Sequence, residues 1–145
     1  MSKVEDFLTA EEEHRIIEAI RTAEKTTSGE IRVHIENSAT LDALTRVKEL
    51  FYLLKMDNTK EANGILFYVA IETRSFAIYG DKGIDERVPE NFWKSIIAIL
   101  EKHFKKSEFT LGLVNGIIAT GNQLQKHFPW TMDNKNELKD EISKG

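Results

Sequence analysis

An acid and a base stand side by side between two glycines in the segment Gly80-Asp81-Lys82-Gly83. A carboxylate can bind a divalent cation, and a lysine ammonium group can contact a phosphate. Glycine lets the backbone turn sharply and lets a ligand come close. The chemistry that this segment predicts is therefore cation or phosphate binding in a tight turn.

Two similar segments occur earlier in the chain. Gly29-Glu30 and Asn63-Gly64 each precede a stretch of apolar residues that predicts a β-strand. Each pairs a glycine with a side chain that carries oxygen. These three segments can act together only if the fold brings them to one place, which depends on the elements that they flank.

The central part of the chain predicts a strand, a helix and a second strand. Residues 31–35 alternate between apolar and polar side chains, as in a strand buried on one face, and we expect this strand toward the edge of the sheet. Residues 41–54 have apolar side chains at helical spacing. Residues 65–71 are almost continuously apolar, as in a central strand covered on both faces. The order predicts a βαβ unit with parallel strands and a right-handed crossover.

A β-hairpin and further helices complete the prediction. Residues 76–79 should pair antiparallel with the second strand after a short polar break. Thr9 and Glu12 form a capping box at the start of a first helix that ends near Thr26. Pro89 fits the first turn of a third helix, and residues 111–126 predict a fourth.

The predicted fold class is a single-domain α/β sandwich. We expect a mixed sheet of three or four strands, made of the βαβ unit and the antiparallel hairpin and covered by about four helices. Residues 1–130 form this domain. Residues 131–145 are mostly polar and charged and are expected to be a disordered tail, or at most a frayed helix.

This topology brings the three glycine segments to the same edge of the sheet. The two parallel strands begin there, and the antiparallel third strand ends there. The connection that precedes the second strand arrives at this edge too. The candidate ligand residues are Asp81, Glu30, Asn63, Lys82 and Asp57, with Asp81 and Glu30 as the candidate metal ligands and Gly29, Gly64, Gly80 and Gly83 shaping the site.

Two interpretations of this edge remain open. Carboxylate and amide oxygens suit Ca²⁺ or Mg²⁺, which prefer oxygen donors, and such an ion could orient a phosphate and activate a water. In the alternative interpretation Asp81 and Lys82 are only turn residues, with the aspartate accepting bonds from nearby backbone N–H groups. Asp57 likewise fits a turn or a helix cap rather than a ligand loop.

Composition narrows the function classes. A chain of 145 residues with 41% hydrophobic content suits one compact domain with a core. Its formal charge of -4, with Lys and Arg mixed among Asp and Glu, argues against a nucleic-acid partner. The chain has no cysteine, which excludes disulfides, thiolate metal sites and cysteine nucleophiles. The paired acids of aspartyl-phosphate enzymes and a Walker phosphate loop are also absent from the sequence.

The chain gives no sign of export or membrane insertion. Its first residues turn acidic at Glu5 and Asp6 and are not followed by the apolar run of a signal peptide. The longest apolar run is far shorter than the roughly 20 residues that span a bilayer. We therefore expect a cytoplasmic monomer.

The order and spacing of several short motifs resemble the TPM domain family. These motifs are Phe7-Leu8-Thr9, Thr27-Ser28-Gly29-Glu30-Ile31, Asn63-Gly64-Ile65-Leu66, Gly80-Asp81-Lys82-Gly83 and His127-Phe128-Pro129. The chain looks most similar to the short, soluble bacterial members. Thylakoid-lumen members have a proposed acid-phosphatase role in photosystem II repair, so the resemblance implies an α/β fold and raises the hypothesis of a phosphatase.

Two functions from different classes follow. The first is a binding or adaptor domain that recognises an unknown protein or a small phosphate ligand at the glycine edge, with or without a divalent cation. The second is a metal-dependent, acid-phosphatase-like hydrolase of phosphate esters. The residues by themselves favour the binding domain, because they offer only a loose set of acids for hydrolysis.

Overall fold

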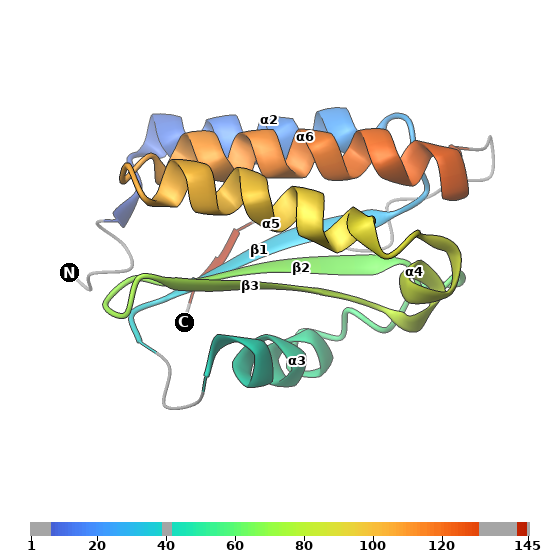
Figure 1. Cartoon of the computed structure of the whole chain (residues 1–145), viewed down its shortest axis with the longest axis horizontal. Helices are drawn as coiled ribbons and strands as arrows, with labels where there is room; N and C mark the ends of the chain where they lie inside the picture. The colour runs from blue at the N-terminus through green and yellow to red at the C-terminus, as the bar shows by residue number, and fades with distance from the viewer. Residues whose placement is uncertain (1–6, 39–41, 131–141, 145) are drawn as a thin grey trace.

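The computed structural model describes residues 7–38, 42–130 and 142–144. The elements in chain order are α2 (Ala10–Glu24), β1 (Glu30–Glu36), α3 (Ala43–Leu53), β2 (Gly64–Ala70), β3 (Ser75–Gly80), α4 (Lys82–Arg87), α5 (Asn91–Phe104), α6 (Phe109–His127) and β4 (Ile142–Lys144). Helices α2, α5 and α6 form a layer on one face of the sheet, and α3 covers the other face (Figure 1). The predicted α/β sandwich is confirmed.

The sheet is mixed and has the strand order β3-β2-β1-β4. Strands β1 and β2 are parallel, with Glu30 opposite Gly64. Strand β3 returns antiparallel to β2, with Gly80 opposite Ile65. The predicted βαβ unit and hairpin are therefore present, and the sheet has four strands, at the upper end of the predicted number.

The predicted place of the first strand was wrong. Strand β4 pairs parallel to β1, with Ile142 opposite Val33, so β1 lies inside the sheet instead of toward its edge. The polar face of β1 is also covered, and Glu30, His34 and Glu36 are all buried. The period-two pattern predicted that the polar side chains of this strand would face solvent. In the structure Glu36 is buried instead, and Arg46 of α3 and Tyr68 of β2 donate hydrogen bonds to it.

The predicted C-terminal tail needs a partial correction. Residues 142–144 form β4, whereas residues 131–141 lie outside the described part of the chain. Ile142 packs against the larger hydrophobic core, and the Ser143 Oγ lies 2.8 Å from His34 Nδ1. This strand forms through tertiary contacts, because three residues have too little local propensity to form one.

Two hydrophobic cores hold the layers together, one on each face of the sheet. The larger core joins α2, α5 and α6 to the sheet, and the smaller core joins α3 to β2. Thr9 and Glu12 form the predicted capping box of α2. Helix α5 begins at Asn91, so Pro89 precedes the helix instead of lying in its first turn. In the described residues no helix is both long and apolar enough to cross a bilayer.

Candidate functional site

The three glycine segments meet at one edge of the sheet, as the topology predicts. The Glu30 N–H donates to the Asn63 carbonyl at 3.2 Å, and the Asp81 N–H donates to the Gly64 carbonyl at 2.9 Å. The Gly83 N–H donates to the carbonyl of Ala62 at 2.9 Å. This part of the molecule, where β1 and β2 begin and β3 ends, is called the Asn63 edge below.

The glycines of the Asn63 edge do not make sharp turns. In the described chain every residue with a positive φ is non-glycine, among them Ala62 at 51°. A Cβ at Gly83 would lie 2.1 Å from the Glu61 carbonyl oxygen, and one at Gly80 would lie 2.4 Å from Trp93 Cη2. Gly29 and Gly64 are crowded in the same way, by Leu124 and Met56. The glycines therefore make room for the protein's own chain.

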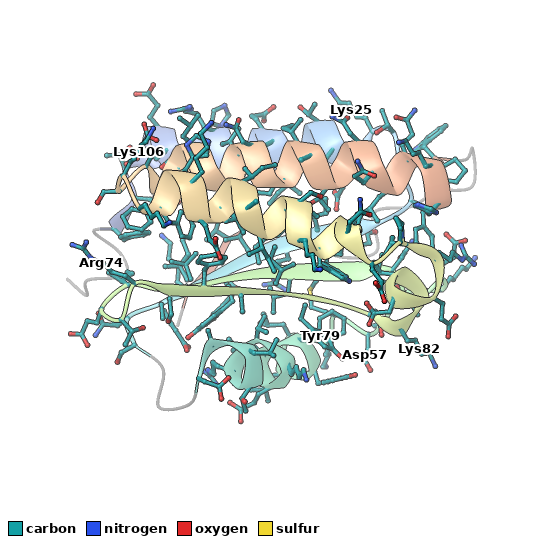
Figure 2. All side chains as sticks on the ribbon, in the orientation of Figure 1. Lys25, Asp57, Arg74, Tyr79, Lys82 and Lys106 are labelled. Carbon is teal, nitrogen blue, oxygen red and sulfur yellow. The ribbon has the colours of Figure 1, made fainter. Side chains whose placement is uncertain are left out.

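Asp81 lies at the start of a helix instead of in an isolated turn, but it accepts a hydrogen bond from a backbone N–H, as the turn interpretation expected. It precedes α4, a short helix that the sequence did not predict, and its Oδ1 accepts from the Lys82 N–H at 2.8 Å. The Lys82 side chain is exposed on α4, and Asp57 is exposed near the end of α3 (Figure 2). Glu30 is buried on β1. Among the described residues no three or more His, Asp or Glu side chains are grouped to hold a metal ion.

Asn63 is the candidate residue whose side chain has several polar neighbours. Its Nδ2 donates to Ser28 Oγ at 3.2 Å and lies 3.5 Å from Glu61 Oε2. The Ser28 hydroxyl donates to the same Glu61 oxygen at 2.7 Å. The Asn63 Oδ1 is buried and has no hydrogen-bond partner in the described structure. The Asn63 amide therefore has two side-chain oxygens beside its Nδ2 and a buried Oδ1 without a partner.

Arg87 connects this edge to the end of α6. Its Nη1 lies 3.9 Å from Glu61 Oε1 and 3.5 Å from the His127 carbonyl. The guanidinium carbon lies 4.5 Å from the centre of the Phe128 ring. The Glu61 carboxylate is thus held between Arg87 and the Ser28 hydroxyl, and its side chain remains 45% exposed, open to a ligand from solvent.

A second polar cluster lies near the opposite ends of β1 and β2. Arg46 on α3 donates two hydrogen bonds to Glu36, at 2.9 and 3.0 Å, and the Tyr68 hydroxyl donates a third at 2.5 Å. His34 Nε2 lies 3.5 Å from Glu36 Oε1, and His34 Nδ1 contacts Ser143. We call these five residues the Glu36 cluster. The alternating pattern of residues 31–35 did not predict this cluster, because such a pattern by itself predicts that only the apolar face of the strand is buried.

Electrostatics keep the Glu36 cluster in one charge state near neutral pH. Burial by itself would raise the pKa of Glu36, but the hydrogen bonds from Arg46 and Tyr68 outweigh it, so the net pKa is lowered from the ordinary 4.5. Burial lowers the pKa of His34 from 6.5, and Glu36 offsets this only in part. Burial and Glu36 raise the pKa of Tyr68. Both oxygens of Glu36 are occupied, which suits a structural ion pair better than a general base.

The lowered pKa values of His34 and Glu36 predict that acid destabilises the protein in two stages. A histidine with a lowered folded pKa stays neutral while the unfolded chain takes up a proton, so stability falls as the pH drops below 6.5. A glutamate with a lowered folded pKa adds stability that is lost as the pH falls below 4.5 and through the folded value. We expect His34→Gln to flatten the first stage and keep the second, in thermal unfolding followed by circular dichroism from pH 7.5 to 3.5.

His14→Gln is the matched control, since His14 is exposed on α2. It should leave both stages as in the parent protein. Equal pH dependence in the His34→Gln and parent proteins would contradict the assignment of the first stage to His34.

Comparison with known proteins gives one family and several similar folds. The family model described as the TPM domain matches residues 1–123. The BA42 protein of the psychrophilic bacterium Bizionia argentinensis, solved by NMR, is 52% identical over 100% of both chains, with a TM-score of 0.93. The N-terminal domain of a P. gingivalis protein is 19% identical, with a TM-score of 0.67, and covers 84% of this chain and 79% of its own. The N-terminal domain of a Corynebacterium glutamicum protein is 11% identical, with a TM-score of 0.66, and covers 93% of this chain and 79% of its own. No curated protein matches the chain.

Proposed function

Because the chain belongs to the TPM domain family, we propose that its α/β domain is a binding domain whose recognition site is the Asn63 edge. We propose further that a divalent cation, Ca²⁺ or Mg²⁺, binds at this edge. The observation that carries the proposal is the buried Asn63 Oδ1 without a hydrogen-bond partner. Leaving such an oxygen unsatisfied costs about 1 to 3 kcal/mol, and a cation that binds this oxygen after the amide has rotated would supply the missing partner.

The side chains around Asn63 fit a cation if the amide rotates. In the present orientation the Nδ2 faces Ser28 Oγ and Glu61 Oε2. Turning the amide by half a rotation would place its oxygen there instead, beside a carboxylate that repels it unless a cation lies between them. Carboxylate, amide and hydroxyl oxygens form the hard donor set that Ca²⁺ and Mg²⁺ prefer. With a single carboxylate, we expect a dissociation constant on the order of 1 mM.

An amide NMR titration tests the cation site. Adding Ca²⁺ and then Mg²⁺ should give saturable shifts of the Gly29, Gly64 and Gly83 signals and of Asn63 itself. Asn63→Ala removes the amide oxygen and should abolish the saturable shifts. Asn58→Ala is the matched control, because Asn58 is exposed in the loop that leads to the edge, and it should bind as the parent protein does. Parent-like titration of Asn63→Ala, or no shift at 10 mM metal, would reject the site.

The second candidate function is metal-dependent hydrolysis of a phosphate ester at the same edge. The exposed Glu61 carboxylate is the feature that favours it, since a cation held there would face solvent and could activate a water. Turnover of p-nitrophenyl phosphate with Ca²⁺, Mg²⁺ or Mn²⁺, lost in Asn63→Ala and kept in Asn58→Ala, would support the hydrolase. Cation binding without turnover would leave the binding domain as the function.

A further inference from the structure

Strand β3 has a free edge. It pairs with β2 on one side, and on its other side no strand from the described part of the chain is paired with it. The Asp81 N–H bonds to the Gly64 carbonyl, so alternation along the ladder turns the backbone groups of Phe76 and Ile78 away from β2. Unpaired strand groups of this kind are a template for another extended segment.

A groove runs along this edge between two helices. Its volume is about 420 Å³. Leu44 of α3 lines one side, Ile97 of α5 lines the other, and Phe76 and Ile78 of β3 lie between them. Leu44 is 53% exposed, so its side chain is accessible to an occupant of the groove. The groove therefore combines unpaired backbone with apolar walls on both faces of the strand.

Cationic residues flank the edge. Arg74 lies at the hairpin turn before β3, and Lys82 lies beyond the opposite end of the strand (Figure 2). Both side chains are exposed, and neither forms an ion pair with another residue of the described structure. The acidic Glu101 lies on the α5 wall. This distribution favours an occupant with negative charge at its ends and an uncharged middle.

We propose that the β3 edge binds an extended peptide segment of another protein by β-strand addition. The segment has apolar or β-branched residues along about five positions and an acidic residue at each end. Backbone hydrogen bonds to Phe76 and Ile78 supply the pairing, while the two walls select the side chains. A second copy of this chain fits less well, because antiparallel pairing of two β3 strands would bring Arg74 near the partner's Lys82 end.

This interaction surface shares only Lys82 with the residues of the Asn63 edge and needs no cation. The test uses the whole chain and the acetylated, amidated peptide Asp-Val-Thr-Val-Thr-Val-Asp as the probe. An amide NMR titration without metal should give saturable shifts centred on residues 75–80, Leu44 and Ile97. Shifts confined to other surfaces, or none at 2 mM peptide, would overturn the proposal.

Two control peptides separate strand addition from other binding. N-methylation of alternate backbone amides keeps the side chains and blocks the pairing, so it should abolish binding. Lysine in place of both aspartates should weaken binding about fivefold or more, because it reverses both terminal contacts. Equal binding of the N-methylated peptide would overturn strand addition. A concentration-dependent dimer in sedimentation, blocked by the peptide, would show that a second copy is the occupant and would also overturn it.

Matched variants of the protein locate the site. Leu44→Gln removes the apolar contact of the α3 wall and should weaken peptide binding about tenfold, whereas Leu53→Gln, also exposed on α3, should not. Arg74→Asn removes the charge and suits the positive φ of 51° at this position, so the fold is retained. It should weaken binding about threefold, and Lys106→Asn should leave it unchanged. Parent-like binding by both Leu44→Gln and Arg74→Asn would place the peptide elsewhere.

Discussion

Gly83→Ala is expected to destabilise the protein by about 2 kcal/mol. Gly83 lies in α4, where helix propensity by itself favours alanine by about 0.5 to 1 kcal/mol. The structure instead predicts that alanine at this position lowers the free energy of unfolding. The new Cβ would lie 2.1 Å from the Glu61 carbonyl oxygen and 2.5 Å from that of Ala62, and neither backbone atom can move away as a side-chain tip can. Urea unfolding of the variant and the parent protein measures the difference in the free energy of unfolding.

Gly116→Ala is the matched control for Gly83→Ala. Gly116 also lies in a helix, but there the Cβ would meet the flexible tip of Leu100 at 3.2 Å. We expect a change within about 1 kcal/mol of the parent protein, because the gain in helix propensity offsets a small rearrangement. A stabilising Gly83→Ala would mean that α4 does not pack on the loop before β2 as described. It would also weaken the case for the Asn63 edge, which this packing holds in place.

Arg46→Met is the second change with a large expected effect, a loss of about 2 kcal/mol at pH 7. It removes two hydrogen bonds from Glu36 and leaves a carboxylate whose side chain is only 7% exposed without its cation. The Arg46 side chain is 25% exposed, so the loss should fall below the 3 to 5 kcal/mol that is typical of a fully buried pair. Thermal and urea unfolding measure it.

The loss caused by Arg46→Met should depend on pH and on Glu36. Removing the Arg46 hydrogen bonds takes away the largest effect that lowers the pKa of Glu36, so this pKa is higher in the variant and the loss relative to the parent protein shrinks as the pH falls from 7 to 5. The double variant Arg46→Met with Glu36→Gln should recover part of the stability at pH 7. Lys48→Met, on the exposed side of the same helix, should have little effect at either pH. An equal loss at pH 7 and pH 5 would argue against an uncompensated charge as its cause.

The two ends of β1 and β2 differ in how their carboxylates are paired and exposed. In the Glu36 cluster both carboxylate oxygens are paired, while the buried His34 Nε2 has no hydrogen-bond partner in the described structure. We interpret this cluster as part of the structural core. At the Asn63 edge a buried oxygen lacks a partner and a carboxylate is exposed, and we interpret it as the ligand site. The free edge of β3 is a third region, suited to a strand and not to an ion.

The elements with strong local patterns could be predicted from the sequence. The capping box of Thr9 and Glu12 is present at the start of α2, and the continuous apolar run of β2 is buried along its whole length. Chain order and handedness then placed β1 parallel to β2 and β3 antiparallel, so the meeting of the glycine segments at one edge followed as well. That the candidate residues bind a ligand at this edge stays a prediction.

The sequence by itself determined the family, the βαβ unit, the hairpin and the edge where Glu30, Asn63 and Asp81 meet, because period, caps and chain order are local properties. Only the tertiary structure decided the rest. Strand β4 exists because it pairs with β1, and Glu36 is buried because Arg46 comes from the facing helix. Gly83 serves close packing instead of a turn because another segment lies against it. A single sequence shows how each residue suits its neighbours along the chain, but the partners that satisfy a buried charge or crowd a glycine are set by long-range contacts.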